Sequence, residues 1–394
     1  MKKHVLNILG FLSLILILTS CGGNQNGAAD DEIIIEGRFI NSRGNLVYLD
    51  IIHVEDIQPL DSIRLDENGS FTYTYKTDKA LFLRILIEED NFITLIAEPG
   101  EHLIVSGDVK ALSETYTVSG SPASELVAEH YSFTQKQYDK LDSIFQVWDQ
   151  NKYSDNKLEL RETLDSLVKV TEEAEKDFTL QLAEKNKENL GTLFILYQHF
   201  GRKPILDEFE YFDLYNEIAK NLAKKHPSNE HVIHFNGKVN SVKLAIQEEA
   251  EIKARLDSGK VAPNFTMKDI NKNAFALEQL RGYVVLLHFW GSWSPESMMQ
   301  LNTIRYFNKT YGPRGLAIVS VSFDFDEASW TEAVNDEKMM WYNVCDFKHN
   351  QSPIARLYHV DEIPFMYVLD RDGTINTKSA SVDTIGQSLY ELLY

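Results

Sequence analysis

Cysteine and positive charge are both scarce in this sequence. The 394 residues include two cysteines, Cys21 and Cys345, which allow at most one intramolecular disulfide. Lysine and arginine together number 39 against 59 aspartates and glutamates, which gives a formal net charge of −20. So acidic a chain is a poor partner for nucleic acid or for a broad anionic membrane surface, because both repel negative charge. The apolar content of 43% suits a sizeable core, and the length suggests two or three domains.

The first residues have the pattern of a secretory signal. A short basic start at residues 1–4 precedes a mostly apolar run, residues 5–18, which is short for a membrane-spanning helix. The sequence Leu-Thr-Ser-Cys then ends at Cys21 and resembles the bacterial lipobox. That resemblance implies that residues 1–20 are a signal peptide and that Cys21 carries a lipid. An ordinary signal peptide with an incidental cysteine is the alternative.

Lipidation of Cys21 predicts both location and partners. Residues 21–31 contain no hydrophobic pattern and would form a flexible tether. Two or more acyl chains would anchor the protein stably in the cell envelope, at the outer membrane, on its periplasmic face or at the cell surface. Cys345 is then the only free thiol, so no intramolecular disulfide can form. The expected partners are the membrane, through the lipid on Cys21, and an envelope protein or peptide, but not nucleic acid.

The rest of the chain predicts an α+β multidomain fold in three parts. Residues 32–120 contain short β-branched and aromatic runs separated by turn residues, which predicts an N-terminal β-sandwich. Residues 121–258 carry apolar residues at three- and four-residue spacing, as in 141–148, which predicts a central α-helical region. Residues 259–394 alternate strand and helix patterns, which predicts an α/β domain.

The most informative segment joins a predicted strand to a predicted helix in the last part. Residues 284–290 form a continuous apolar run, typical of a buried central strand. The sequence Gly-Ser-Trp-Ser-Pro-Glu-Ser follows and ends at Ser297. Ser294 is a good N-cap, and the proline and glutamate after it favour the start of a helix.

Three motifs together resemble the membrane-anchored, thioredoxin-like thiol-disulfide oxidoreductases with peroxiredoxin affinities. Members of that family carry Ala-Pro-x-Phe, then Phe-Trp-x-x-Trp-Cys-x-x-Cys, then Ile-Pro before a strand that ends in Asp-x-x-Gly. The matching positions are Ala262, Pro263, Phe265, Phe289, Trp290, Trp293, Ile363, Pro364, Asp370 and Gly373. The resemblance implies a C-terminal thioredoxin-like domain over residues 259–394, with serine at both cysteine positions, Ser294 and Ser297.

The front of the chain resembles an all-β domain of unknown function that begins many thioredoxin-like lipoproteins of the Bacteroidetes. The shared segments are Asp61-Ser62, Asn68-Gly69-Ser70-Phe71, Ala97-Glu98-Pro99-Gly100 and Val118-Ser119-Gly120-Ser121. None of these residues calls for catalysis. The resemblance therefore extends over nearly the whole chain.

Serine at positions 294 and 297 removes the chemistry of that family. A serine hydroxyl forms no disulfide and is far less acidic than a thiol. We therefore expect Ser294 to act only as a cap, with Ser297 small and polar beside it. A serine hydrolase is the alternative, which would need a base within hydrogen-bond reach. His288 lies in the preceding strand, beneath the motif, where we expect a neutral buried histidine.

The resemblance also implies a cis-proline at Pro364. The groove between Trp293 and the pair Ile363–Pro364 is then the candidate site for an extended peptide. Cys345 follows an apolar strand pattern and is expected to be buried and inert, with a lone reactive thiol as the alternative. No catalytic residue, metal ligand or cofactor is expected.

These observations leave three functional hypotheses. The leading one is a redox-inactive thioredoxin-like lipoprotein, not an enzyme, which serves as a binding or accessory module in the bacterial envelope. The second is a thiol-disulfide oxidoreductase by family, with residual or non-standard activity. The third is a structural accessory subunit of an outer-membrane complex. Fold alone does not decide among them.

Overall fold

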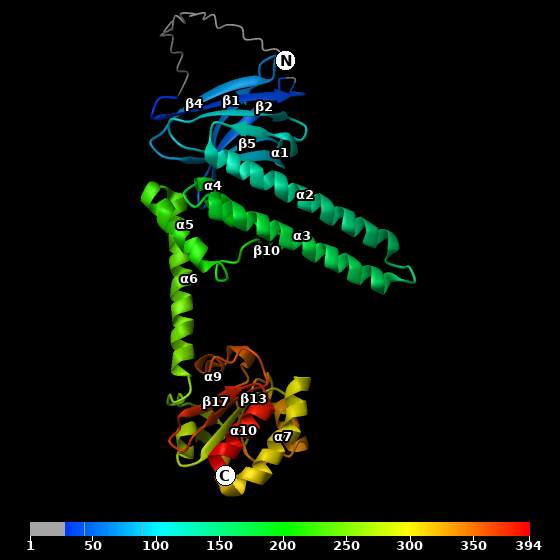
Figure 1. The fold of residues 1–394 in the computed structure, drawn as a ribbon, viewed down its shortest axis with the longest axis vertical. Coiled ribbons are helices and arrows are strands. Elements are labelled where there is room, and N and C mark those ends of the chain that lie inside the picture. The colour runs from blue at the N-terminus through cyan, green and yellow to red at the C-terminus, as the bar shows by residue number, and fades with distance from the viewer. Residues whose placement is uncertain (1–27, 43, 89) are drawn as a thin grey trace, which may run out of the picture. The chain divides into compact units, whose positions relative to one another are not determined.

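The computed structural model describes residues 28–42, 44–88 and 90–394 (Figure 1). The predicted signal peptide, most of the predicted tether and Cys21 lie outside the described residues. The chain divides into two compact units between Asn240 and Ser241, inside helix α6 (Glu230–Arg255). None of the described helices combines the length and the apolar character needed to cross a bilayer.

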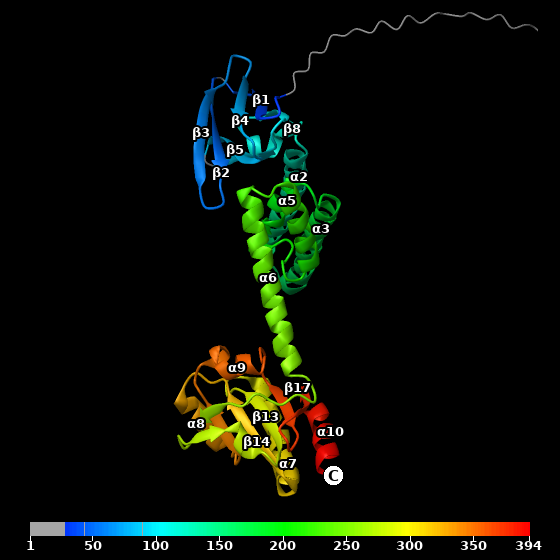
Figure 2. The same cartoon turned by 90° about the vertical axis from the view of Figure 1, so that its left-hand side faces the viewer.

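The N-terminal unit begins with two four-stranded sheets (Figure 2). One has the strand order β4-β1-β7-β8 and the other β3-β2-β5-β6, and every pair is antiparallel except β1–β7. A short helix, α1 (Leu112–Thr115), precedes the last strand. The strands are β1 (Glu32–Ile40), β2 (Leu46–Ile52), β3 (Ile57–Arg64), β4 (Ser70–Lys76), β5 (Leu81–Glu88), β6 (Asn91–Ala97), β7 (His102–Asp108) and β8 (Thr117–Ser119).

Side chains from both sheets form one core, as the predicted β-sandwich requires. Ile35 of β1, Leu49 of β2, Ile85 of β5 and Leu103 of β7 are each at most 1% exposed. Buried and exposed residues alternate along β1, because successive side chains of a strand point to opposite faces. Only the end of β3 was predicted from the sequence, because this strand is mostly exposed and shows no such alternation.

The helical part of this unit follows directly. It contains α2 (Pro122–Asn151), α3 (Lys157–Lys185), α4 (Leu190–Leu196), α5 (Phe212–Lys225) and α6, with a small hairpin of β9 (His199–Phe200) and β10 (Lys203–Pro204). Helices α2 and α3 pack side by side as a long hairpin (Figure 1). Phe82 and Ile96 of the sandwich share a core with Leu126 of α2 and Leu193 of α4. The predicted boundary after residue 120 therefore falls inside one compact unit.

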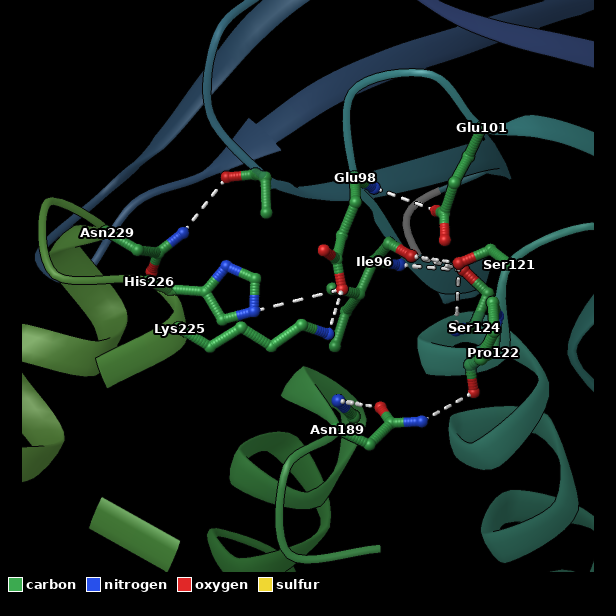
Figure 3. Close-up of polar contacts among 12 residues, drawn as sticks. Ile96, Glu98, Glu101, Ser121, Pro122, Ser124, Asn189, Lys225, His226 and Asn229 are labelled. Atoms are coloured by element: carbon green, nitrogen blue, oxygen red, sulfur yellow. Dashed lines mark hydrogen bonds and ion pairs between the residues drawn. The ribbon is translucent and has the colours of Figure 1, made fainter. Parts of the chain in front are cut away.

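Polar contacts hold the sandwich to the helices (Figure 3). Ser121, the N-cap of α2, and Ser124 donate hydrogen bonds to the carbonyl oxygen of Ile96 at 2.7 and 2.8 Å. The Ser124 hydroxyl also accepts from the Ile96 N–H at 2.8 Å. Glu98 forms an ion pair with Lys225, the last residue of α5, at 3.4 Å. The sequence segments around Glu98 and Ser121 thus have structural roles at this junction.

The C-terminal unit is built on a five-stranded sheet of order β15-β14-β13-β16-β17. Strands β13, β14 and β15 are parallel, and β16 and β17 add antiparallel strands at the other side. Its strands are β11 (Thr266–Lys268), β12 (Ala274–Ala276), β13 (Val284–Trp290), β14 (Leu316–Ser322), β15 (Tyr342–Cys345), β16 (Phe365–Leu369) and β17 (Ile375–Ser379). Its α-helices are α7 (Pro295–Tyr311), α8 (Glu327–Asp336), α9 (Pro353–Leu357) and α10 (Val382–Leu393), joined by the 3-10 turns η1 (Leu277–Leu280), η2 (Gly312–Arg314) and η3 (His349–Gln351).

Both faces of this sheet are covered, which explains the continuous apolar run in β13. Leu286 packs on one face with residues of α7 and α10. Leu287 and Phe289 pack on the other face with residues of the β11–β12 hairpin and α9. The predicted strand from Ile363 begins two residues later, at Phe365, and Pro364 has no N–H to donate to the sheet.

Candidate functional site

Strand β13 brings the serine-containing segment to the carboxyl edge of the sheet. All seven residues of the strand are buried, and α7 begins at Pro295 after a short loop. Strand β14 runs parallel, with Trp290 opposite Ser322 at the ends of the two strands. The residues that follow β14 therefore lie beside the loop between β13 and α7, although they are about 30 positions further along the sequence.

Ser294 is the N-cap of α7, as predicted. Its backbone is extended, and its Oγ accepts a hydrogen bond from the backbone N–H of Ser297 at 3.2 Å. The only other group within hydrogen-bond distance of Ser294 Oγ, among the described residues, is a carboxylate oxygen of Glu296 at 3.4 Å. Ser297 is fully buried, and its Oγ has no hydrogen-bond partner within the described chain. The fold thus uses one of these two hydroxyls and leaves the other unpaired.

His288 is buried in the middle of β13. Its Nδ1 lies 3.2 Å from the Oγ of Ser320, which itself accepts a hydrogen bond from Trp341 Nε1 at 2.8 Å. The Ser320 oxygen has two lone pairs, so this contact is compatible with either neutral tautomer of His288, and Nε2 has no hydrogen-bond partner among the described residues. Complete burial lowers the pKa of His288 to about 3, because the charged form loses its hydration. The side chain is a neutral, fully buried histidine, as the sequence indicated.

The described residues do not form a serine hydrolase site. Ser294 Oγ contacts a backbone N–H and the Glu296 carboxylate, whereas the hydrogen-bonding atom of His288 is engaged with Ser320. A general base must lie within reach of the nucleophile and have a pKa near the working pH. His288 fails the second requirement, because its pKa is near 3.

A buried carboxylate, not found by sequence reasoning, holds the loop before Ser294. Asp324 is 2% exposed and accepts hydrogen bonds from the Ser292 hydroxyl at 2.5 Å and the Ser292 N–H at 3.2 Å. The Ser322 hydroxyl donates to its other oxygen at 2.5 Å. The available signal was its position directly after a buried strand parallel to β13, since such strand ends meet at one edge of the sheet.

Three aromatic rings lie together beside this loop. Trp293 is 50% exposed, and its Nε1 donates to the carbonyl oxygen of Phe323 at 3.1 Å, which fixes the indole. The ring of His349 lies 5.0 Å from that of Trp293 and stacks on Phe325 at 4.2 Å. Phe325 is 67% exposed. An apolar, solvent-facing surface of this kind is suited to contact with another molecule.

The Ile363–Pro364 peptide is cis and lies close to the same loop. A Cβ added to Gly291 would come within 2.8 Å of Trp293 Nε1 and 3.0 Å of Ile363 Cδ1. Trp293 and Ile363 therefore flank Gly291. We call Trp293, Phe325, His349, Ile363 and Pro364 the aromatic surface.

Cys345 lies beside the segment that contains Asp324, with its Sγ 3.5 Å from the carbonyl oxygen of Ser322 and 3.9 Å from that of Asp324. It is 5% exposed, and burial raises the pKa of its thiol to about 11, so that little thiolate forms at neutral pH. It lines a cavity of about 560 Å³ between the β11–β12 hairpin and the β15 edge. The other cysteine, Cys21, is outside the described residues. No group of acidic, histidine or cysteine side chains suited to a metal ion occurs in the described part of the chain.

Two family models match the sequence. Residues 258–378 match the AhpC/TSA family, and residues 33–127 match a domain of unknown function, DUF4369. The first match agrees with the β-α-β order of the C-terminal unit. This unit is a thioredoxin-like domain that matches the AhpC/TSA family model, and it is preceded by an all-β region and a helical region.

Characterised relatives match the same part of the chain. The thiol-disulfide oxidoreductase ResA of Bacillus cereus is 25% identical over 126 residues, which are 32% of this chain and 71% of that protein. The thioredoxin-like protein YneN of Bacillus subtilis is 28% identical over 122 residues, 30% of this chain and 69% of that protein. A solved thiol-disulfide oxidoreductase from Bacteroides fragilis, 27% identical, aligns with 34% of this chain and all of its own, with a TM-score of 0.33.

Proposed function

We propose that this protein is a redox-inactive, thioredoxin-like binding module of the bacterial envelope. The observation that carries the proposal is Ser294 and Ser297 at the start of α7, where we infer that the oxidoreductase relatives have their cysteine pair. Thiol-disulfide exchange needs a thiolate that attacks and a second sulfur that resolves the mixed disulfide. Here the Ser294 hydroxyl caps a helix, and neither side chain contains sulfur.

Two contacts that fix the loop and its tryptophan support a binding role for this domain without the cysteine pair. Asp324 fixes the loop that precedes Ser294, and the Phe323 carbonyl fixes the exposed indole of Trp293. We infer that an extended peptide lies along Ile363 and Pro364 and contacts the indole. Exposed aromatic side chains held in one orientation lose little entropy on binding and often dominate the affinity of an interface.

Residual thiol-disulfide oxidoreductase activity is the second candidate, and the names of the relatives favour it. It would have to use Cys345, the one thiol among the described residues. The burial of this thiol and its raised pKa argue against attack on an exposed disulfide. We therefore prefer a binding role over residual redox activity.

The location of the protein is part of the same proposal. We propose that a lipid on Cys21 anchors it to the outer membrane, where it is an accessory to an envelope protein or complex. The acidic charge supports attachment by lipid in preference to electrostatic attraction to anionic headgroups. A Cys21→Ser variant should leave the membrane fraction. If the variant remains bound after a high-salt wash, the lipid is not the anchor.

Insulin reduction with dithiothreitol tests the proposed lack of redox activity. The full chain should not accelerate insulin precipitation above the background set by dithiothreitol alone. Turnover that is lost in a Cys345→Ser variant would establish the oxidoreductase candidate instead. A Cys345→Ser variant that behaves like the unchanged protein, with both inactive, supports the binding module.

Substitutions in the aromatic surface test its binding role. A partner captured from native membranes is titrated against the full chain and against Trp293→Ala, which should weaken binding by about thirtyfold, equivalent to about 2 kcal/mol. Tyr306→Ala is the matched control, because Tyr306 is a 59% exposed aromatic residue on α7 outside that surface. Equal affinity of the two variants would remove the aromatic surface from the proposal.

A further inference from the structure

The hairpin of α2 and α3 has an apolar stripe that is covered along only part of its length. Near the sandwich, Leu126 of α2 and Leu182 of α3 are buried in a core with Leu193 of α4. From residue 138 to residue 170, a stretch described throughout, Leu164 is the one buried residue. The first part has a third layer of helix, and the second part has none in the described chain.

The uncovered part of the hairpin presents many large apolar side chains. Between α2 and α3 lies a groove of about 370 Å³, with Phe145 and Trp148 on one wall and Leu164 and Val168 on the other. These residues continue the stripe that α4 covers nearer the sandwich. The exposed large hydrophobic residues of this stretch are Phe145 (53%), Val147 (41%), Tyr153 (89%), Leu158 (72%), Leu167 (47%) and Val170 (61%).

We propose that this groove is the contact surface of a homodimer, covered by the same part of the hairpin from a second copy of this chain. Two helices cannot bury a stripe wider than their mutual contact, and four helices can, as in antiparallel bundles. In a twofold arrangement each copy offers a groove and an apolar ridge of its own, so one surface serves both partners. This assignment does not depend on the binding role of the aromatic surface.

The charges around the groove favour a second copy over a lipid surface. Residues 138–170 contain five basic and seven acidic side chains, an excess that anionic headgroups repel. Several charges are paired within one helix, including Arg161 with Asp165 at 3.6 Å on the rim of the groove, and Lys152 with Asp149 at 3.0 Å. Because the stretch carries only two more acidic than basic side chains, an identical surface repels it less than a uniformly anionic headgroup surface does.

The size of the surface also fits a dimer. The helical stretches 138–151 and 157–170 are each about 21 Å long, and two helices side by side are about 20 Å wide. With its side-chain relief such a face offers roughly 600–800 Å² of accessible surface, within the range that one partner contributes to a stable interface.

Sedimentation velocity and hydrogen exchange on the unmodified full chain, in mild detergent, test the proposal. The weight-average mass should rise from monomer to dimer with concentration. Amides within residues 138–170 should exchange more slowly at high concentration than at low, whereas those of the sandwich should not change. A chain that stays monomeric at about 100 µM, or protection confined to other segments, overturns the proposal.

A substitution in the groove gives an independent test. Phe145→Asp should raise the dimer dissociation constant at least thirtyfold, because it places a charge in the apolar contact. Ile233→Asp on α6 is the matched control, because Ile233 is similarly exposed (58%) and lies outside the hairpin. Circular dichroism checks that each variant retains its helices. If Phe145→Asp and Ile233→Asp have the same dimer dissociation constant, the proposal is overturned.

Discussion

Two helices, one in each unit, begin with the same sequence pattern, Ser-Pro-x-Ser. At the start of α2 the Ser121 Oγ accepts from the Ser124 N–H at 3.4 Å, and at the start of α7 the Ser294 Oγ accepts from the Ser297 N–H at 3.2 Å. The two starts differ in their second serine. Ser124 is hydrogen bonded to both backbone groups of Ile96 (Figure 3), whereas the buried Ser297 Oγ has no partner in the described chain.

This difference between the two helix starts shows which of the four serines have a structural role in the described chain. Helix capping and the junction with the sandwich account for Ser121, Ser124 and Ser294. Ser297 has no such account, and a buried hydroxyl without a partner is unfavourable. Cysteine behaves in such a place as a small hydrophobic residue with weak hydrogen bonding. A cysteine at position 297 would therefore leave no strong hydrogen-bonding group unpaired.

The largest expected effect is the appearance of redox chemistry at one helix start and not at the other. The double variant Ser294→Cys/Ser297→Cys should gain insulin reductase activity of at least a hundredfold over the unchanged chain, because a thiol at a helix N-terminus has a lowered pKa. Redox titration should show one dithiol–disulfide transition.

The chain offers a matched control at α2. Ser121→Cys/Ser124→Cys places the same spacing of thiols at the same cap positions. Both pairs are buried, at 0% exposure for Ser121 and Ser124 and at 3% and 0% for Ser294 and Ser297. The α2 pair faces the backbone of Ile96 in the sandwich, whereas the α7 pair follows the half-exposed Trp293. That variant should remain inactive towards insulin. Equal activity in both variants would show that the surroundings of α7 contribute nothing specific, and an inactive α7 variant with a titratable disulfide would show that its surface no longer admits substrate.

Acid should destabilise the C-terminal unit, because the buried His288 of β13 is not protonated in the folded chain. Burial lowers the pKa of His288 to about 3, against about 6.5 when unfolded. Below pH 6.5 the unfolded chain therefore binds a proton that the folded chain does not, so stability falls as the pH falls. The loss approaches about 1.4 kcal/mol per pH unit well below pH 6.5 and amounts to about 2 kcal/mol between pH 6.5 and 4.5.

Denaturant unfolding followed by tryptophan fluorescence measures this loss, since four of the five tryptophans are in the C-terminal unit. His288→Gln, which can still bond to Ser320 but does not titrate, should flatten the pH dependence of that unit. His130 in α2 is a control, because burial lowers its pKa to about 4 and His130→Gln should act on the other unit. A slope unchanged by His288→Gln would mean that this histidine is protonated in the folded protein.

Removing the second serine should have opposite results at the two starts. Ser124→Ala leaves the fully buried N–H of Ile96 without its partner and should destabilise the N-terminal unit by about 2 kcal/mol. Ser297→Ala removes a hydroxyl that has no partner and should be neutral or stabilise by up to about 1 kcal/mol. Thermal unfolding of both variants measures the difference. Equal destabilisation would imply that Ser297 has a partner, such as an ordered water molecule.

Local rules predicted much of the fold and part of the site. Apolar alternation, apolar runs and cap residues depend on near neighbours, so the sandwich, the helices, the buried β13 and the Ser294 cap were all accessible from the sequence. Asp324, Phe325 and His349 were not, because they reach the site through the parallel pairing of β13 with β14 and through later turns. The sequence also could not predict that Ser124 has hydrogen-bond partners and Ser297 has none, since the partner of Ser124 is 28 residues away on a strand.

The smallest expected effect concerns the feature that the two starts share. Ser294→Ala and Ser121→Ala each remove an N-cap oxygen and should destabilise their own unit by about 1 kcal/mol, while Ser294→Gly should lose only a few tenths. Ser121→Ala should be the more costly of the alanine variants, because its hydroxyl also donates to Ile96 whereas Ser294 has no second backbone partner among the described residues. Chemical denaturation, resolved by unit, provides the measurement. If Ser294→Ala is without effect while Ser121→Ala destabilises, capping does not explain serine at position 294.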